Sequence, residues 1–278
     1  MFVKNNFFMK RIGIFGDCTV VQKEFEILSK SNEIIISGFF FNENNNNIAS
    51  NITKFENFNE LLENSDIIEF LTPSKDIFKY ISKTIKNVKN LILAPEILRS
   101  KDLRKFLMLS EEAEIKFYIK KNANFIDMIK NKIKNFDNLN CLNIKYYNYN
   151  VYHINQIFLM IFDVMNIITS LDNIKINKMN IYKFSTYSYN DSIYVNLLTS
   201  KSNIINFTII SQFSKNLLIA EVYEQEMIYE INFTENTKTD YKREDILTII
   251  KKFNNNQELF DPEKEIYPLI LTHQIIEN

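Results

Sequence analysis

The sequence predicts two domains: an α/β domain built on a doubly wound parallel sheet, then an α+β domain with an open, mostly antiparallel sheet. Up to residue 120, short apolar runs alternate with segments whose apolar residues recur at helical spacing, which is typical of a parallel sheet with helices on both faces. From residue 142, apolar and polar residues alternate along each run, as in strands with one solvated face. We therefore expect domains at 1–120 and 121–278, with final helices able to pack back on the first domain.

Length and charge limit the function classes. The 278 residues give room for two medium domains, and 33 basic against 34 acidic residues leave a net charge of −1. This balance argues against nucleic acid as a partner. The most apolar later segment, 154–171, is interrupted by polar residues, so we expect no membrane partner. Two distant cysteines, Cys18 and Cys141, cannot build a disulfide framework or a metal cluster, and a reducing cytoplasm is the expected location.

The segment from Lys10 to Ser31 predicts a strand, a tight turn and a helix. Arg11–Phe15 is an apolar run typical of a strand buried on both faces, and it ends at Gly16. Asp17 or Thr19 can cap the helix that follows. Backbone N–H groups at such a helix N-terminus, together with the positive end of the helix dipole, can bind a pyrophosphate. The segment therefore predicts the first unit of a dinucleotide-binding, Rossmann-type domain.

The glycine motif of this unit is incomplete. Where G-x-G-x-x-G would place three glycines, the chain has Gly16, Cys18 and Val21, so only the turn glycine is present. Cys18 is either a reactive thiol at a helix N-terminus or a packed small residue. After the second strand, Asn42 or Glu43 stands where an acidic residue would bind the ribose; a polar loop start is the other interpretation.

The remaining elements follow from the same patterns. Predicted strands in the first domain are 11–15, 33–41, 67–71, 91–95 and 115–119. Helices lie between them, including 76–86 and 101–113, the latter with Ser100 as its cap. Predicted strands in the second domain are 142–146, 174–187, 192–198, 204–211, 217–223 and 227–233, with turns at Asn190–Asp191 and at 200–203. Its helices are 154–171, 241–253 and 262–276, the last starting at Asp261–Pro262.

In this order of elements the chain resembles the glucose-fructose oxidoreductase, inositol dehydrogenase and MocA family of NAD(P)-dependent oxidoreductases. The residues that carry the resemblance are Ile12–Gly16, Phe58–Leu62 with Ser65–Ile68, Leu71–Ser74, Leu91–Pro95 and Ile161–Asp163. The block from Phe58 to Ser74 is the most specific of these. The resemblance covers nearly the whole chain. It implies hydride transfer between NAD or NADP and a sugar or polyol, with a lysine and a histidine handling the proton of the reacting oxygen.

The resemblance also implies where the site residues would be. A cofactor would be held by Gly16, Asp17, Cys18, Thr19, Val20, Asn42, Thr72, Pro73 and Pro95. Ala94 stands at the position of the family lysine, and Met160 at that of the histidine, three residues before Asp163. The catalytic groups are thus unassigned. Asp163 is a candidate for catalysis or for a structural hydrogen bond, because a carboxylate buried without partners is costly.

Each of the other polar residues has a structural interpretation as well as a functional one. The two histidines, His153 and His273, are expected to have a structural role or to lie on the surface. His153 could also swing toward the cleft in which a substrate would bind. Lys120 and Lys121 could reach an anionic substrate, but a solvated pair is the default expectation. No metal site is expected.

Two functions remain open at this point. The first is a divergent NAD(P)-dependent oxidoreductase that acts on a small sugar or polyol. The second is a catalytically inactive descendant that serves as a binding or scaffolding subunit. In either case the second sheet is expected to mediate homo-oligomer formation.

Overall fold

The computed structural model describes residues 9–31, 34–41, 52–121, 139–147, 154–171, 175–184, 192–210, 217–224, 228–232, 253 and 261–278. The chain divides into two compact units. Unit 1 comprises Met1–Lys120 and Asp245–Glu265, and unit 2 comprises Lys121–Glu244 and Ile266–Asn278.

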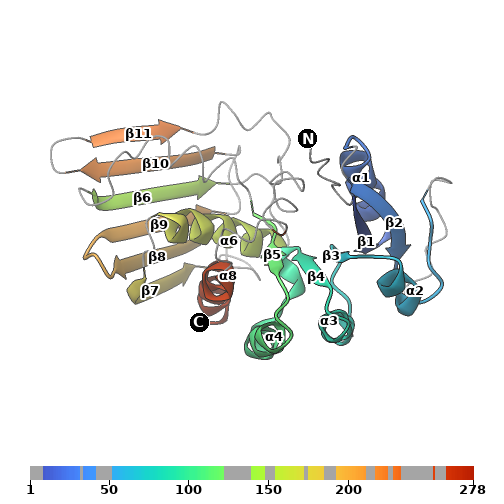
Figure 1. The fold of residues 1–278 in the computed structure, drawn as a ribbon. Coiled ribbons are helices and arrows are strands. Elements are labelled where there is room, and N and C mark those ends of the chain that lie inside the picture. Colours follow the sequence, from blue (N-terminus) through green and yellow to red (C-terminus); the bar gives the residue numbers. More distant parts are fainter. Residues whose placement is uncertain are drawn as a thin grey trace, which may run out of the picture. The chain divides into compact units, whose positions relative to one another are not determined.

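Unit 1 is built on a parallel sheet. Its strands are β1 (Lys10–Phe15), β2 (Ile34–Phe40), β3 (Ile67–Phe70), β4 (Asn90–Leu93) and β5 (Phe117–Ile119). They lie in the order β2-β1-β3-β4-β5, and all four adjacent pairs are parallel (Figure 1). This arrangement confirms the predicted doubly wound α/β fold.

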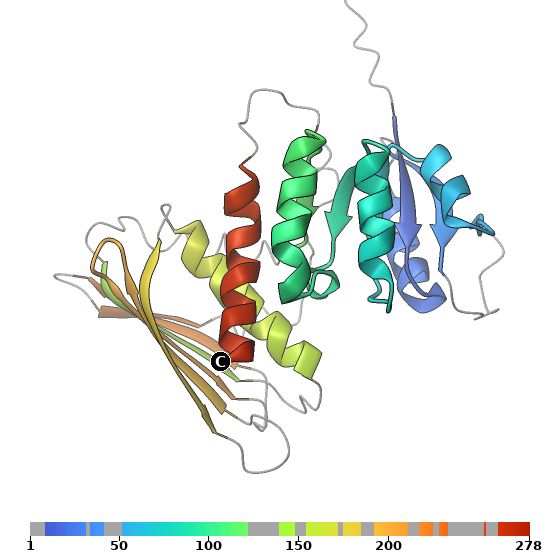
Figure 2. The same cartoon turned by 90° about the horizontal axis from the view of Figure 1, so that it is seen from below.

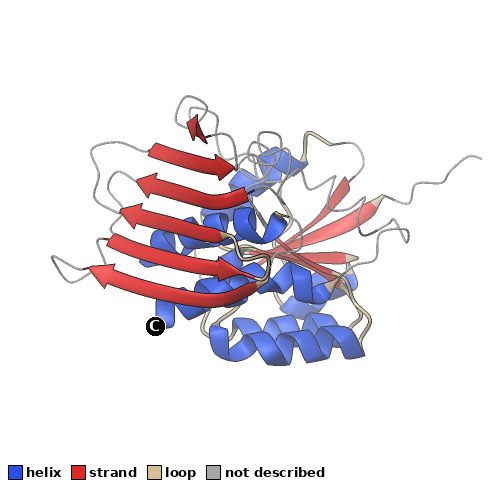
Figure 3. Cartoon of the chain, turned by 90° about the vertical axis from the view of Figure 1, so that its left-hand side faces the viewer, coloured by secondary structure: helices blue, strands red, loops and turns tan. Residues whose placement is uncertain are grey.

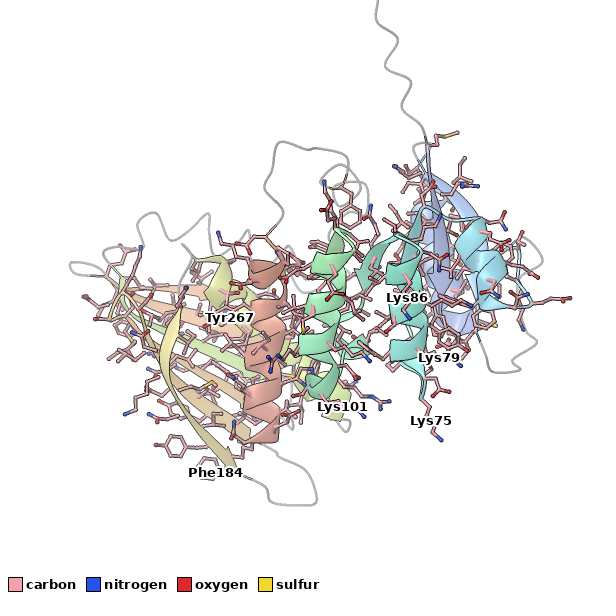
Figure 4. The ribbon with its side chains drawn as sticks, turned by 60° about the horizontal axis from the view of Figure 1, so that its bottom comes forward. Lys75, Lys79, Lys86, Lys101, Phe184 and Tyr267 are labelled. Atoms are coloured by element: carbon pink, nitrogen blue, oxygen red, sulfur yellow. The ribbon has the colours of Figure 1, made fainter. Side chains whose placement is uncertain are left out.

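Helices cover both faces of this sheet, as Figure 2 shows. They are α1 (Cys18–Leu28), α2 (Phe58–Glu63), α3 (Ile77–Lys86), the 3-10 turn η1 (Pro95–Ile97) and α4 (Ser100–Glu112). Helix α1 packs through Val21 and Leu28 on the face that carries Ile12 and Ile14. Alternate strand residues point to the other face, where Phe106 of α4 lies edge-on to Phe117 of β5, with ring centroids 4.7 Å apart. On the outer side of α3, Lys79 and Lys86 point into solvent (Figure 4).

An aromatic cluster joins β1 to α2 and α3. The ring of Phe15 contacts Phe58 and Tyr80 at centroid distances of 6.0 and 5.1 Å, and Tyr80 lies 4.8 Å from Phe58. Close packing of α2 on β1 requires Gly13, because a Cβ there would lie 2.3 Å from Ser65 Oγ and 2.7 Å from Leu61 Cδ1. The glycine thus sets how closely α2 approaches the sheet.

Unit 2 is built on a six-stranded mixed sheet. Its strands are β6 (Leu139–Tyr147), β7 (Ile176–Phe184), β8 (Ser192–Thr199), β9 (Ile204–Ile210), β10 (Leu217–Glu224) and β11 (Ile228–Asn232). Their order is β11-β10-β6-β9-β8-β7, and every adjacent pair is antiparallel except β6 and β9. This confirms the predicted open, mostly antiparallel sheet, whose strands lie side by side in Figure 3.

One face of the second sheet forms the core of unit 2. Helices α6 (Ile154–Ser170) and α8 (Pro262–Glu277) contribute to this core together with inward residues of the strands. Ile161, Val164 and Ile168 of α6 are fully buried against Ile144 and Phe207. The alternation of buried and partly exposed residues along β6, β8, β9 and β10 leaves the other face without helices among the described residues. Tyr267 of α8, labelled in Figure 4, accepts a hydrogen bond at its hydroxyl from the backbone of Ile176, at 3.0 Å.

The sequence located the described elements within a few residues, and two details differ. Ser100 is the first residue of α4 rather than its cap, which is Arg99. The predicted strand 91–95 ends at Leu93, because Pro95 begins the 3-10 turn. Of the predicted helix 241–253, only Phe253 lies inside the described residues, and the turn at Asn190–Asp191 lies outside them. Within the described part of the chain, none of the helices has the length and apolar character that crossing a membrane requires.

Candidate functional site

The predicted cofactor residues of unit 1 gather at the carboxyl edge of its parallel sheet. Hydrogen bonds between successive strand ends define this edge: Leu71 N donates to Phe15 O, and Ala94 N donates to Phe70 O, both at 2.9 Å. Gly16, Thr72 and Ala94 therefore lie at the ends of the neighbouring strands β1, β3 and β4. Ligands of open α/β sheets bind in the crevice outside the carboxyl ends of the strands, so this edge is the candidate binding site.

Asp17 is the residue that organises this edge. Its Oδ1 accepts hydrogen bonds from the backbone N–H groups of Thr19 and Val20, at 3.0 and 3.1 Å, and so caps α1. Its Oδ2 accepts from Thr72 Oγ1 at 3.0 Å, and Thr72 Oγ1 in turn accepts from Asp17 N at 3.0 Å. A carboxylate is thus bound where the helix dipole favours negative charge. Of the two caps that the sequence allowed, Asp17 is the one used.

The other positions of the glycine motif have distinct roles. A Cβ at Gly16 would lie 3.2 Å from Thr72 Oγ1 and 3.5 Å from Val21 Cγ2, so the glycine allows β1, α1 and the end of β3 to meet closely. Val21 is only 1% exposed and packs into the core of unit 1. Cys18 is half-buried and is not part of a disulfide.

Not every predicted cofactor residue can be placed. Asn42, Glu43 and His153 lie outside the described residues. Thr72 is half-buried and Pro73 is exposed, whereas Pro95 is buried in the 3-10 turn after β4.

A buried ion cluster lies inside unit 1, and the sequence did not predict it. Lys120 Nζ lies 2.9 Å from Glu24 Oε1 of α1 and also bonds Glu69 Oε1 of β3. The three side chains are only 5%, 4% and 0% exposed, respectively. The expectation that Lys120 is solvated was therefore wrong. The signal was Glu69, a carboxylate inside a strand buried on both faces, which needs a cationic partner.

Asp163 and Met160 lie on α6 in unit 2. Met160 is 2% exposed and belongs to the core. Asp163 is 9% exposed, and burial raises the pKa of its carboxyl group to about 8. None of the residues described in the structure forms a hydrogen bond with this carboxyl group that would support the structural interpretation. Asp163 therefore holds its proton at neutral pH, which is the property of a buried carboxylic acid that can donate a hydrogen bond.

The remaining histidine has a packing role. The imidazole of His273 on α8 lies 5.1 Å from the ring of Phe158, and its Nδ1 is 3.9 Å from Glu277 Oε1. As for metals, the described part of the chain brings together no group of three or more His, Cys, Asp or Glu side chains that could hold an ion.

Comparison with known proteins identifies the fold of this chain but does not assign it to a family. No family model matches this sequence. No curated protein matches it either. Solved structures match over nearly its whole length. A dehydrogenase (MviM) from Clostridium difficile has a TM-score of 0.77 at 17% identity, covering 96% of this chain and 99% of that one.

Two further matching structures are of dehydrogenases whose names include a substrate. The UDP-N-acetylglucosamine 3-dehydrogenase from Acidithiobacillus ferrooxidans has a TM-score of 0.78 at 13% identity, with 96% of each chain covered. The scyllo-inositol dehydrogenase from Lactobacillus casei, solved with bound NAD(H) and scyllo-inositol, has a TM-score of 0.73 at 11% identity, covering 97% of this chain and 96% of that one. At such identities the likeness establishes a shared fold: this chain has the fold of these sugar and polyol dehydrogenases.

Proposed function

We propose that this protein is an NAD(P)-dependent oxidoreductase that acts on a sugar or polyol-type substrate. The observation that carries this proposal is the α1 N-terminus, which lies at the carboxyl edge of a parallel sheet in a chain with the whole-length fold of sugar and polyol dehydrogenases. One of those dehydrogenases holds NAD(H). The likeness to the glucose-fructose oxidoreductase, inositol dehydrogenase and MocA family supports the same function.

The residues at this edge fit a dinucleotide. The N–H groups of Thr19 and Val20 already hold an anionic group, the carboxylate of Asp17, so they are donors suited to a phosphate oxygen. The backbone of Gly16–Val20 would bind the pyrophosphate, with Thr72, Pro73 and Pro95 beside it at the ends of β3 and β4. Asn42 would contact the ribose. A bound NAD(P) supplies the carbon that accepts or donates hydride.

Asp163 on α6 stays the candidate for proton handling that the sequence indicates. Burial keeps its carboxyl group protonated at neutral pH, the state in which a carboxylic acid can donate a hydrogen bond. Neither Ala94 nor Met160, which stand at the positions of the family lysine and histidine, can exchange a proton.

A second candidate function is favoured by these same two positions. The side chains at positions 94 and 160 are neither acids nor bases. Hydride transfer would therefore lack the groups that usually exchange a proton with the substrate. The protein would then be a catalytically inactive descendant that binds or scaffolds other molecules.

Calorimetric titration with NAD(H) and NADP(H), followed by turnover assays on a panel of sugars and polyols, tests the two functions. We expect micromolar to millimolar binding of one dinucleotide and slow turnover that Asp163→Asn lowers. Binding without turnover would select the inactive descendant. A complete lack of binding to either dinucleotide would reject the oxidoreductase. Glu26→Gln, on the exposed side of α1, is the matched control and should leave both measurements unchanged.

We further propose that the protein forms a homo-oligomer through the helix-free face of the second sheet. This open face carries Tyr182, Phe184, Leu198, Ile204 and Ile228, which are 52%, 63%, 38%, 44% and 73% exposed. Figure 4 marks Phe184 at the end of β7. Tyr182 and Phe184 lie on the edge strand β7, whereas Leu198, Ile204 and Ile228 stand in one row across the sheet. Exposed apolar side chains around a polar centre are compatible with a protein interface.

The centre of the open face is polar but internally satisfied. Asn143, Asn196 and Asn206 stand in register on β6, β8 and β9 and bond one another, and Asn206 Nδ2 donates to Asn143 Oδ1 at 2.8 Å. Glu221 continues this row and pairs with Lys145. Because the asparagine side chains already bond one another, a partner that covered them would leave few of their polar groups unpaired.

Light scattering after size-exclusion chromatography tests the oligomer. Tyr182→Asp combined with Leu198→Asp should shift the mass toward the monomer, because it buries unpaired charge in the interface. Met108→Asp, at a residue of α4 that is 52% exposed, is the control and should not change the mass. A monomeric wild-type protein at micromolar concentration would contradict the proposal. We also propose the reducing cytoplasm as the location of this protein; neither Cys18 nor Cys141 is part of a disulfide.

A further inference from the structure

The carboxylate of Asp17 accepts more hydrogen bonds at the α1 N-terminus than a helix cap requires. One of its oxygens takes both the Thr19 and the Val20 N–H groups, and the other takes the hydroxyl proton of Thr72. The Asp17 N–H group, in turn, donates to Thr72 Oγ1. The side chain is thus fixed between the start of α1 and the end of β3, with its charge in front of the helix.

A pyrophosphate at this helix would need the same donors. The first turn of a helix offers only a few free N–H groups, and here two of them are engaged by Asp17. A diphosphate bridge also carries two negative charges, which would lie beside the carboxylate. Like charges a few ångströms apart near a protein surface repel one another even where water screens them in part.

We propose that Asp17 is an internal competitor for the anion site of α1 and sets the affinity for the dinucleotide. In the free protein its carboxylate occupies the site. The dinucleotide binds when the Asp17 side chain turns away, which releases the Thr19 and Val20 N–H groups and the Thr72 hydroxyl. This inference rests on the proposed function, because it presupposes that a dinucleotide binds at this edge.

Three variants distinguish two effects of Asp17: its side chain occupies the N–H donors of α1, and its negative charge repels a phosphate. Asp17→Gly removes the side chain and frees the donors, and glycine is itself a well-tolerated residue at a helix N-cap. Asp17→Asn keeps an oxygen that can cap the helix but removes the charge. Glu26→Gln removes one charge from an exposed position of the same helix and serves as control.

The dissociation constants of NAD+ and NADP+ are measured by calorimetry for the wild type and each variant, with thermal melting of the free proteins to verify folding. We expect Asp17→Gly to bind at least about tenfold more tightly than the wild type, Asp17→Asn to lie between them, and Glu26→Gln to match the wild type. Because the readout is binding, it does not depend on catalysis.

The outcomes are distinct. If the wild type binds a dinucleotide and Asp17→Gly binds it equally or more weakly, Asp17 is no competitor and the inference fails while the proposed function stands. If the wild type shows no binding but Asp17→Gly binds, Asp17 blocks the site completely, so the inference holds while the proposed oxidoreductase function of the wild type fails. If none of the folded proteins binds, the inference and the proposed oxidoreductase fail together.

Discussion

The carboxyl group of Asp163 gives the protein a pH dependence that can be derived from one residue. Its pKa in the folded state, about 8, lies above the ordinary value of 3.8, and burial is the cause. Between these values the unfolded chain releases the proton while the folded chain keeps it. The free energy of unfolding therefore falls as the pH rises through this range, and the loss is complete above about pH 8.

Asp163→Asn should remove this dependence. The variant keeps the shape of the side chain without an ionisable proton, so it should be more stable than the wild type by on the order of 4 kcal/mol at pH 7 and equally stable near pH 4. Urea unfolding at several pH values from 4 to 9 measures the difference. Parallel curves for the two proteins would show that a partner in the folded state stabilises the charged form.

The buried Lys120 makes a second residue-level prediction. Lys120→Met leaves the carboxylates of Glu24 and Glu69 in the core without their ammonium group, which should lower the free energy of unfolding by about 3 to 5 kcal/mol. Adding Glu24→Gln and Glu69→Gln to this variant should restore much of the loss. Lys79→Met, on the exposed side of α3, is the control for lysine removal and should change stability little.

At the scale of elements, the approach of α2 to β1 depends on the missing side chain of Gly13. Gly13→Ala should lower the free energy of unfolding by about 1 to 3 kcal/mol, because the new methyl group would overlap Ser65 and Leu61. Gly16→Ala, whose Cβ would stand at 3.2 Å or more from its neighbours, should cost less. Equal stabilities of both variants and the wild type would mean that α2 shifts freely on the sheet.

The elements were predictable because hydrophobic periodicity is a local property. Alternating runs located β6 and β8 to β10, and helical spacing located α3, so the fold class followed from the sequence. The partners of charged residues are not local: Lys120, Glu69 and Glu24 are far apart in the chain, and only the fold brings them together. The same holds for Thr72, which lies 55 residues from Asp17 and fixes its carboxylate.

At the scale of the whole molecule, the chain passes between its two units more than once. Unit 1 includes Asp245–Glu265 in addition to Met1–Lys120. Two hydrogen bonds tie this later segment to β5 and the residue before it: Lys116 Nζ donates to Phe253 O at 2.9 Å, and Ile119 N donates to Glu265 Oε1 at 3.0 Å. The sequence suggested a return of the final helices to the first domain but could not assign these contacts.

A fragment of residues 1–120 should therefore be less stable than the same residues in the full chain. It lacks the acceptors of Lys116 and Ile119 and exposes the core position that Phe253 covers. Urea unfolding followed by circular dichroism measures this. The later segment supplies the acceptor of Lys116 at residue 253 and the acceptor of Ile119 at residue 265. Full native stability of the short fragment would show that the later segment contributes nothing to unit 1.

The aromatic cluster around Phe15 has a consequence for spectroscopy. The chain contains 14 tyrosines and no tryptophan, so its near-ultraviolet signals come without indole bands. Tyr80 is held between the rings of Phe15 and Phe58, a chiral and rigid environment. Its phenol should consequently contribute strongly to the dichroism near the tyrosine absorption maximum. The difference between the wild-type and Tyr80→Phe spectra would then be an optical marker for the docking of α2 and α3 on the sheet.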